Sequence, residues 1–330
     1  MTGRRLMRST FCLSLLLLTA CVAPTATPER LPTRAVTPTP PPTPFFIAAQ
    51  NYYEEGMARR EAGDAEGALQ SFAWAIQLAP DFAPVYVARG SLYLTQGDFW
   101  RALADADRAL EADPANAAAY ALRGETLRLR GRPRSALESF DLALELDPVL
   151  ASETFQSRWL AARAAHEGRR LLVLSGEYAD AHQGPLRCYY RGWAFIELGT
   201  PGIAINILIE GIETAPEPPA LLWFVLGHAY AANHFWQEAV VSFEAARLLM
   251  QAGDTSLSVH SDQPVAALFG ALGQAYLGAE RCVDAEAMLE YALEVGAPTA
   301  EYTAELEEAR VCQTPTPTIT PYPTTTPSAP

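Results

Sequence analysis

Apolar residues between positions 45 and 312 recur at helical spacing, and few stretches alternate between apolar and polar residues as a half-buried strand would. Phe155, Trp159 and Ala162 illustrate the spacing, because residues three and four apart lie on one face of a helix. Alanine is abundant, and several apolar runs end at Asp-Pro, as at residues 113–114 and 147–148. Proline pushes the preceding residue out of helical geometry, so such runs predict short, separate helices. The pattern predicts an all-α fold.

Four kinds of position repeat at an interval of 34 residues. The sets are Pro80, Pro114 and Pro148; Gly56, Gly90 and Gly124; Ala68, Ala102 and Ala136; and Ala75, Ala109 and Ala143. Length alone would suggest two domains, but a constant interval of this size is the signature of stacked repeats.

This arrangement resembles the tetratricopeptide repeat, a helix–turn–helix unit of 34 residues with an aromatic residue, a glycine, alanines and a terminal proline at set places. The resemblance implies an α-solenoid, a right-handed superhelix of about seven helix pairs whose first helices line a concave groove. It covers nearly all of residues 49–312, with units beginning near Ala49, Ala83, Ala117, Ala151, Pro185, Ala220 and Ala266. The last unit follows an insertion of about a dozen residues, "AGDTSLSVHSDQ". Residues 299–312 are expected to form a capping helix with Tyr302, Leu306 and Ala309 facing inward.

Glycine inside a helix costs about 1 kcal/mol relative to alanine, so a compensating contact is expected at Gly124. We expect the two helices of its unit to approach most closely at Gly124 and Ala136, with Phe140 among the large neighbours. The unit at 151–184 is irregular, because Arg158 and Arg170 stand where glycine and alanine belong. It is either a distorted repeat or a longer, differently packed helix pair.

The two ends of the chain are predicted to lie outside the solenoid of residues 45–312. Residues 1–20 combine arginines with an apolar run, as in a secretory signal peptide. The sequence "LTAC" at residues 18–21, which ends in Cys21, resembles the bacterial lipobox. The resemblance implies lipid on Cys21 and a protein anchored at the extracytoplasmic face of the bacterial cell membrane; an ordinary cleaved signal is the alternative. Proline- and threonine-rich residues 21–44 and 313–330 are expected to form a tether and a disordered tail.

Three cysteines remain in the predicted solenoid. Cys282 falls in the turn of the last pair and Cys312 ends the capping helix, and stacking of equivalent helices would bring the two together. In an oxidising compartment a disulfide between them is expected, the alternative being two partly buried thiols. Cys188 occupies an aromatic position of its repeat and is expected in the core.

Charge and motifs argue against several functions. The chain has a net charge of −14 and is predicted to be exported, so nucleic acid is not an expected partner. Nine arginines between Arg123 and Arg170 form either a solvated face or a site for an acidic partner or an anionic envelope polymer. The five histidines have no zinc-binding spacing, and no phosphate loop or nucleophile elbow is present, so we expect neither enzymatic activity nor a metal or cofactor.

The resemblance also places particular residues on the concave wall. The predicted partner-binding groove comprises Tyr53, Arg60, Glu125, Arg128, Trp159, Arg163, Tyr189, Trp193, Glu197, Phe224 and His228, with Met57, Ser91, Phe155 and Gln274 beside them. The lysine, asparagine and arginine clamp of chaperone-binding members has no counterpart, since the matching positions are Tyr53, Met57, Ala88, Ala118 and Leu122. The central aromatics are either packed between repeats or exposed as a hot spot for a peptide.

These features predict a lipid-anchored scaffold that binds another envelope protein through its groove. A receptor for a glycan or cell-wall polymer, with Trp159, Tyr189 and Trp193 stacking on sugar rings, is an alternative of a different class. A passive envelope spacer is the third.

Overall fold

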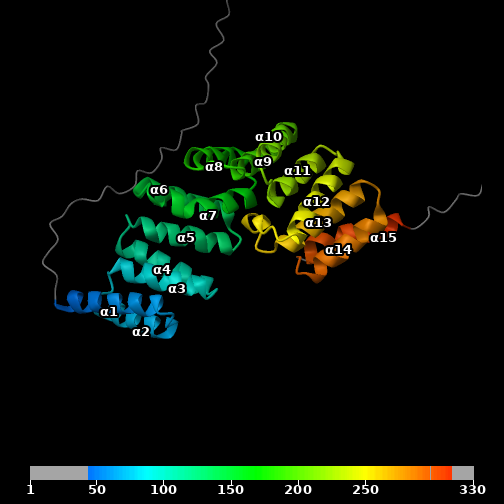
Figure 1. Cartoon of the computed structure of the whole chain (residues 1–330). Coiled ribbons are helices and arrows are strands. Elements are labelled where there is room, and N and C mark those ends of the chain that lie inside the picture. The colour runs from blue at the N-terminus through cyan, green and yellow to red at the C-terminus, as the bar shows by residue number, and fades with distance from the viewer. Residues whose placement is uncertain (1–43, 298, 314–330) are drawn as a thin grey trace, which may run out of the picture. The chain divides into compact units, whose positions relative to one another are not determined.

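The computed structural model describes residues 44–297 and 299–313, and these form helices joined by short turns, with no strand among them (Figure 1). The predicted signal peptide, tether and tail, and with them Cys21, lie outside the described residues apart from Pro44 and Gln313. The helices pair in chain order: α1 (Pro44–Glu61) with α2 (Ala65–Leu78), α3 (Ala83–Thr95) with α4 (Phe99–Ala112), α5 (Ala117–Leu129) with α6 (Pro133–Leu146), α7 (Leu150–Ala164) with α8 (Gly168–Ala181), α9 (Leu186–Glu197) with α10 (Pro201–Thr214), α11 (Ala220–Ala232) with α12 (Trp236–Gln251), and α13 (Pro264–Gly278) with α14 (Cys282–Glu294).

Each pair packs against the next, and α15 (Thr299–Cys312) follows the seventh pair. The prediction of an all-α solenoid of about seven helix pairs is therefore confirmed. No helix among the described residues is both long and apolar enough to cross a bilayer.

Side-chain caps and prolines set the helix boundaries. The carboxylates of Asp64 and Asp98 and the amide oxygen of Asn116 accept hydrogen bonds from backbone N–H groups three residues on, at 2.9, 3.1 and 2.9 Å. Such bonds satisfy donors that the first helical turn leaves unpaired. Asp113 and Asp147, each followed by proline, adopt extended backbone geometry after α4 and α6, as their sequence predicts.

The close approach predicted at Gly124 is present. A Cβ atom at this position would lie 2.9 Å from Cδ1 of Phe140, and the Phe140 side chain is buried. The missing side chain of Gly124 thus makes room for an aromatic ring from α6, and burial of that ring compensates for the low helix propensity of glycine.

Residues 151–184 form a helix pair of ordinary length that is packed differently from the others. Helix α8 packs more extensively against α9 than against its own partner α7. Arg158 explains the difference, because its large side chain occupies the position at which the other units have glycine. It is 5 % exposed, and its Nη2 donates to the carbonyl of Ala151 and to Glu177. The unit is therefore a distorted repeat.

The last helix covers the end of the solenoid. Tyr302, Leu306 and Ala309 of α15 are buried, as predicted, against α13 and α14. Cys282 and Cys312 form the expected disulfide, with Cα atoms 5.9 Å apart, and Cys188 has a free thiol. The covalent bond joins the start of α14 to the end of α15.

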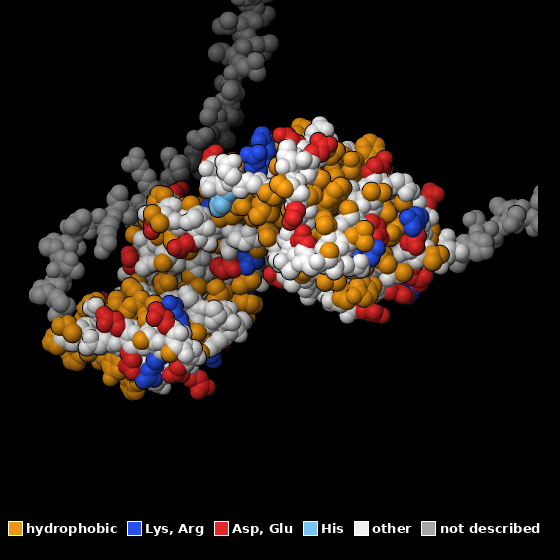
Figure 2. All heavy atoms as spheres, viewed as in Figure 1, with side chains coloured by type: hydrophobic (Ala, Val, Ile, Leu, Met, Phe, Trp, Pro, Cys, Tyr) orange, Lys and Arg blue, Asp and Glu red, His pale blue; other side chains and the backbone are white. Residues whose placement is uncertain are grey.

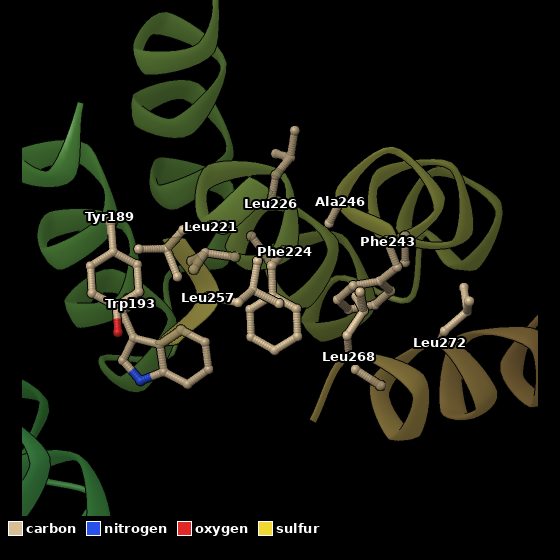
Figure 3. Close-up of a cluster of buried hydrophobic side chains, with 14 of the residues drawn as sticks. Tyr189, Trp193, Leu221, Phe224, Leu226, Phe243, Ala246, Leu257, Leu268 and Leu272 are labelled. Atoms are coloured by element: carbon tan, nitrogen blue, oxygen red, sulfur yellow. The ribbon is translucent and has the colours of Figure 1, made fainter. Parts of the chain in front are cut away.

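The insertion between α12 and α13 packs into the body of the solenoid. It contains a short 3-10 helix, η1 (Ser256–Val259). Asp254 and Ser256 accept hydrogen bonds from the backbone N–H groups of Ala220 and Leu221, at 2.9 and 3.1 Å, so the insertion caps α11. Leu257 is 2 % exposed and lies among Trp193, Phe224 and their neighbours (Figure 3).

Candidate partner-binding cleft

Two adjoining cavities are lined mainly by α9, α11, α13 and α15, with further residues from α7, α12 and the insertion. The first has a volume of about 370 Å³, and its polar lining comes from Arg163, Trp193, His228, His260 and several neighbouring residues. The second has a volume of about 610 Å³ and continues past Trp193 and His228. Because the same side chains form part of both walls, we treat the two cavities as one cleft, called the α9–α15 cleft below.

An acidic and apolar lining distinguishes the second cavity. Glu197, Glu305 and Glu308 contribute carboxylates, and Trp236 contributes an aromatic wall. Glu305 Oε1 accepts a hydrogen bond of 3.3 Å from Nε2 of Gln274, whereas its Oε2 atom is buried without a hydrogen-bond partner. A residue that lines the cavity thus carries an unpaired acceptor, which a donor reaching it would satisfy.

Arg163 is the cationic group of the first cavity. Its Nη1 atom lies 2.8 Å from Nδ1 of His260, and its guanidinium lies 5.6 Å from the centre of the Trp193 ring. Burial lowers the pKa of His228 to about 4 and that of His260 well below its ordinary value, and the charge of Arg163 adds to both effects. Both imidazoles are consequently neutral near pH 7, and the positive charge at this end comes from Arg163.

Of the predicted groove residues, the central aromatics are covered. Trp159 and Tyr189 are fully buried, Phe224 is 1 % exposed, and Trp193 is 9 % exposed. The insertion accounts for part of this burial, since the His260 ring lies 4.7 Å from Trp193 and 4.8 Å from Phe224 between ring centres. Trp193 and Phe224 reach the cleft only through parts of their surface, and Trp159 and Tyr189 line neither cavity.

The remaining predicted residues fall into separate places. Arg163, Glu197 and His228 line the α9–α15 cleft, as does Gln274. Tyr53 and Arg60 line a different cavity of about 280 Å³ in the first three units, together with Met57 and Ser91. Glu125 and Arg128 pair with each other at 2.6 Å, so their charges largely cancel. The structure does not gather the predicted set into one continuous site.

The arginine-rich segment is partly neutralised by neighbouring acids. Arg123 pairs with Asp107, Arg158 with Glu177, and Arg170 with Asp141, at 3.0, 2.9 and 2.9 Å. On the face shown in Figure 2, acidic and basic side chains are scattered among apolar ones. Arg123 and Arg170 therefore fit the solvated-face interpretation, whereas Arg158 is buried and Arg163 lines the α9–α15 cleft.

Several residues of the cleft were missed by sequence reasoning. His260, Ser261 and Gln263 come from the insertion, and Glu305 and Glu308 come from the capping helix, to which only a structural role was assigned. The interruption of the repeat at residues 252–263 was the available signal, because an insertion that departs from a repeat often carries function. No group of three or more histidines, cysteines or carboxylates is placed to hold a metal ion within the described residues.

Comparisons with known proteins agree with this architecture. Residues 53–99 and 87–151 match the sequence model of the tetratricopeptide repeat, and no curated protein sequence matches the chain. A tetratricopeptide repeat protein from Parabacteroides merdae ATCC 43184 is similar in structure, with a TM-score of 0.62 and 15 % identity over 80 % of this chain and 99 % of that one. The sequence match supports tetratricopeptide repeats within residues 53–151, and the structural similarity supports the α-solenoid fold of the helix pairs.

Two shorter similarities are confined to about a third of the chain. The TPR2B domain of yeast Sti1, in a complex with an Hsp70 peptide, is 26 % identical over 36 % of this chain and 98 % of that domain, with a TM-score of 0.34. The TPR domain of Arabidopsis OM64 is 24 % identical over 37 % of this chain and 98 % of that domain, also with a TM-score of 0.34. We draw no functional conclusion from either.

Proposed function

We propose that the protein is a lipid-anchored, extracytoplasmic adaptor that binds a segment of another envelope protein in the α9–α15 cleft. The observation that carries this proposal is the cleft itself, which combines apolar walls with two buried polar atoms, Trp193 Nε1 and Glu305 Oε2, that have no hydrogen-bond partner. Buried polar groups are ordinarily paired, so a ligand that supplies an acceptor and a donor would be bound preferentially. Stacked helix repeats commonly use such surfaces to bind extended or helical peptides.

The lipid anchor is part of the same proposal and rests on the sequence around Cys21. A Cys21→Ser variant is expected to lack the lipid, to appear in the soluble extracytoplasmic fraction, and to show no acyl mass on its N-terminal peptide. Equal membrane retention of the variant and the original chain would remove this part of the proposal without affecting the cleft.

The structure gives little support to the glycan receptor. That function requires aromatic faces open to a sugar ring, whereas Trp159 and Tyr189 are fully buried and Trp193 is 9 % exposed. We therefore do not propose it.

Blocking the cleft tests the adaptor function. Gln274 lies on α13, is only partly buried, and lines both cavities, so Gln274→Trp would fill the cleft. Gln237→Trp adds the same side chain at an exposed position on α12 and is the matched control. After crosslinking in the native membrane, the partner should be recovered with the original chain and with Gln237→Trp and lost with Gln274→Trp, at equal melting temperatures.

Two results would contradict the adaptor function. Recovery of the same partner with both variants would place binding elsewhere on the protein. Absence of any specific partner would favour the passive spacer.

A further inference from the structure

We infer that the α9–α15 cleft is bipolar and selects a partner segment that carries both an acidic and a basic side chain. The acidic group would lie at the Arg163 end, and the basic one would lie among Glu197, Glu305 and Glu308. This inference rests on the proposed function and specifies the chemistry of the segment that is bound.

The Arg163 end has the features of a carboxylate site. Among the ion pairs of the described residues, Arg163 has no carboxylate partner; its hydrogen bond at 2.8 Å goes to a neutral histidine. Trp193, which is 9 % exposed, lines the same cavity, and its Nε1 atom is buried without an acceptor. A carboxylate would accept hydrogen bonds from both groups, and such charge-assisted bonds are stronger than neutral ones.

The other end has the opposite character. Three glutamates line the second cavity, and none of the described residues that line it is an arginine. The only ion pair recorded for these three among the described residues is that of Glu197 with the exposed His166, at 3.1 Å. Glu305 Oε2 is buried without a donor. A lysine or arginine side chain would supply that donor and the balancing charge.

The apolar walls fit the stem of such a basic side chain. Trp236, Ile196 and Leu277 line the second cavity beside the carboxylates. Long basic side chains bury their methylene groups against apolar surface while the charged head reaches polar partners. An aromatic wall adds cation–π attraction when the head lies over its face.

Because the two cavities are continuous, a single bound segment can contact both charged ends. Trp193, His228, Ala271 and Gln274 line both cavities, so one bound segment would reach both ends. The net charge of −14 would also attract any cationic peptide, but only weakly and without fixing the position at which the peptide binds. The Arg163 end would reject a purely basic segment, and specificity arises from this unfavourable pairing as much as from the favourable ones.

Synthetic peptides provide a direct test with the full chain. The probes are acetylated and amidated decapeptides of alanine, leucine and serine that carry one glutamate and one lysine at each spacing from two to six residues. Control peptides carry the glutamate alone, the lysine alone, or two lysines. At physiological salt, fluorescence anisotropy should show at least one mixed-charge spacing that binds about tenfold more tightly than every control peptide, because two charged contacts act together.

Variants assign each charge to its end. Arg163→Gln should reduce the mixed-charge advantage to the level of the lysine-only peptide, and Glu305→Gln with Glu308→Gln should reduce it to that of the glutamate-only peptide. Arg134→Gln and Glu294→Gln remove exposed charges of the same kinds away from the cleft and should leave binding unchanged. Unchanged melting temperatures confirm that the variants fold.

Several outcomes would overturn the inference. These are equal binding of mixed and single-charge peptides, no binding by any probe, or a mixed-charge advantage that survives both cleft variants. If the partner captured in the membrane is still lost with Gln274→Trp while the peptides fail, the adaptor function stands and the bipolar recognition falls. If the peptides succeed and no partner is captured, the adaptor function falls instead.

Discussion

A single absent side chain sets the distance between two helices at Gly124. The ring of Phe140 occupies the space that a Cβ atom would need, 2.9 Å away at its nearest point. Protein interiors are packed so closely that one additional methyl group forces neighbouring atoms to move, so close packing requires glycine at this position. At Gly176, where nothing lies within 4 Å of an added Cβ, the same residue is only a loss of helix propensity.

Two alanine substitutions should therefore act in opposite directions. Gly124→Ala is expected to lower the free energy of unfolding by about 1–3 kcal/mol, because the ring must shift. Gly176→Ala, in α8 with nothing within 4 Å of the new Cβ, is expected to raise it by about 0.5–1 kcal/mol. Urea denaturation followed by circular dichroism measures both. A stabilising Gly124→Ala would refute the close approach.

Backbone conformation at the turn within each pair is a second residue-scale feature. Gly97 and Gly131 have φ values of 76° and 69° there, in the left-handed region that favours glycine. His166, His234 and Glu280 hold the corresponding turns with φ values of 56°, 60° and 59°. Side chains rarely adopt this conformation, so these three turns are strained.

Replacing one of these residues by glycine should relieve the strain. Glu280→Gly is expected to raise the melting temperature, with a gain of about 1 kcal/mol in the free energy of unfolding. Gly97→Ala is expected to lower the free energy of unfolding by about the same amount. Differential scanning calorimetry of the two variants checks the signs, and a destabilising Glu280→Gly would contradict the left-handed conformation.

Among the elements, the insertion has the greatest effect on the site. It brings His260 against Arg163 and Tyr189, at 2.8 and 3.3 Å, and covers the aromatics at the centre of the predicted groove. The buried imidazoles stay neutral, since burial lowers the pKa of His260 well below its usual value. Packing of the insertion consequently depends on a histidine that resists protonation.

Acidification should weaken this packing. Below about pH 6.5, His260 binds a proton in the unfolded chain but not in the folded one. The free energy of unfolding is therefore highest near neutral pH and falls as the pH is lowered toward 4. Between pH 7 and 5 the free energy of unfolding should fall by about 2 kcal/mol more in the original chain than in His260→Gln. The exposed His182→Gln is the control. Parallel pH profiles for all three proteins would show that folding does not lower the pKa of His260.

The disulfide fixes the capping helix to α14 and closes a loop in which the cysteines are 30 positions apart. Cys282→Ser combined with Cys312→Ser is expected to lower the free energy of unfolding by about 3 kcal/mol and to speed hydrogen exchange in α15 first. A reductant should produce the same change in the original chain and no further change in the double variant. Equal exchange in oxidised and reduced protein would contradict the stabilising role.

Across the whole molecule, the sequence predicted those features that depend on local spacing. The interval of 34 residues located the helix pairs, and the position of Arg158 identified the irregular unit. The cleft was less predictable, because its walls come from helices far apart in the chain and from a segment outside the repeat. Family-based placement put Trp159 in the groove, whereas its ring is fully buried and lies 6.2 and 4.7 Å from the rings of Tyr189 and Tyr190 on α9, between ring centres.

Site-specific photocrosslinking tests the central claim most directly. A small aliphatic diazirine amino acid, similar in size to glutamine so that the cleft stays open, is placed at Gln274, inside the α9–α15 cleft, or at Gln237, on the exposed face of α12, and the full chain is irradiated in its native membrane. The account predicts one discrete crosslinked polypeptide from position 274, attached through a segment with both acidic and basic residues, and none from position 237. Equal crosslinking from both positions, or none from the cleft, would contradict it.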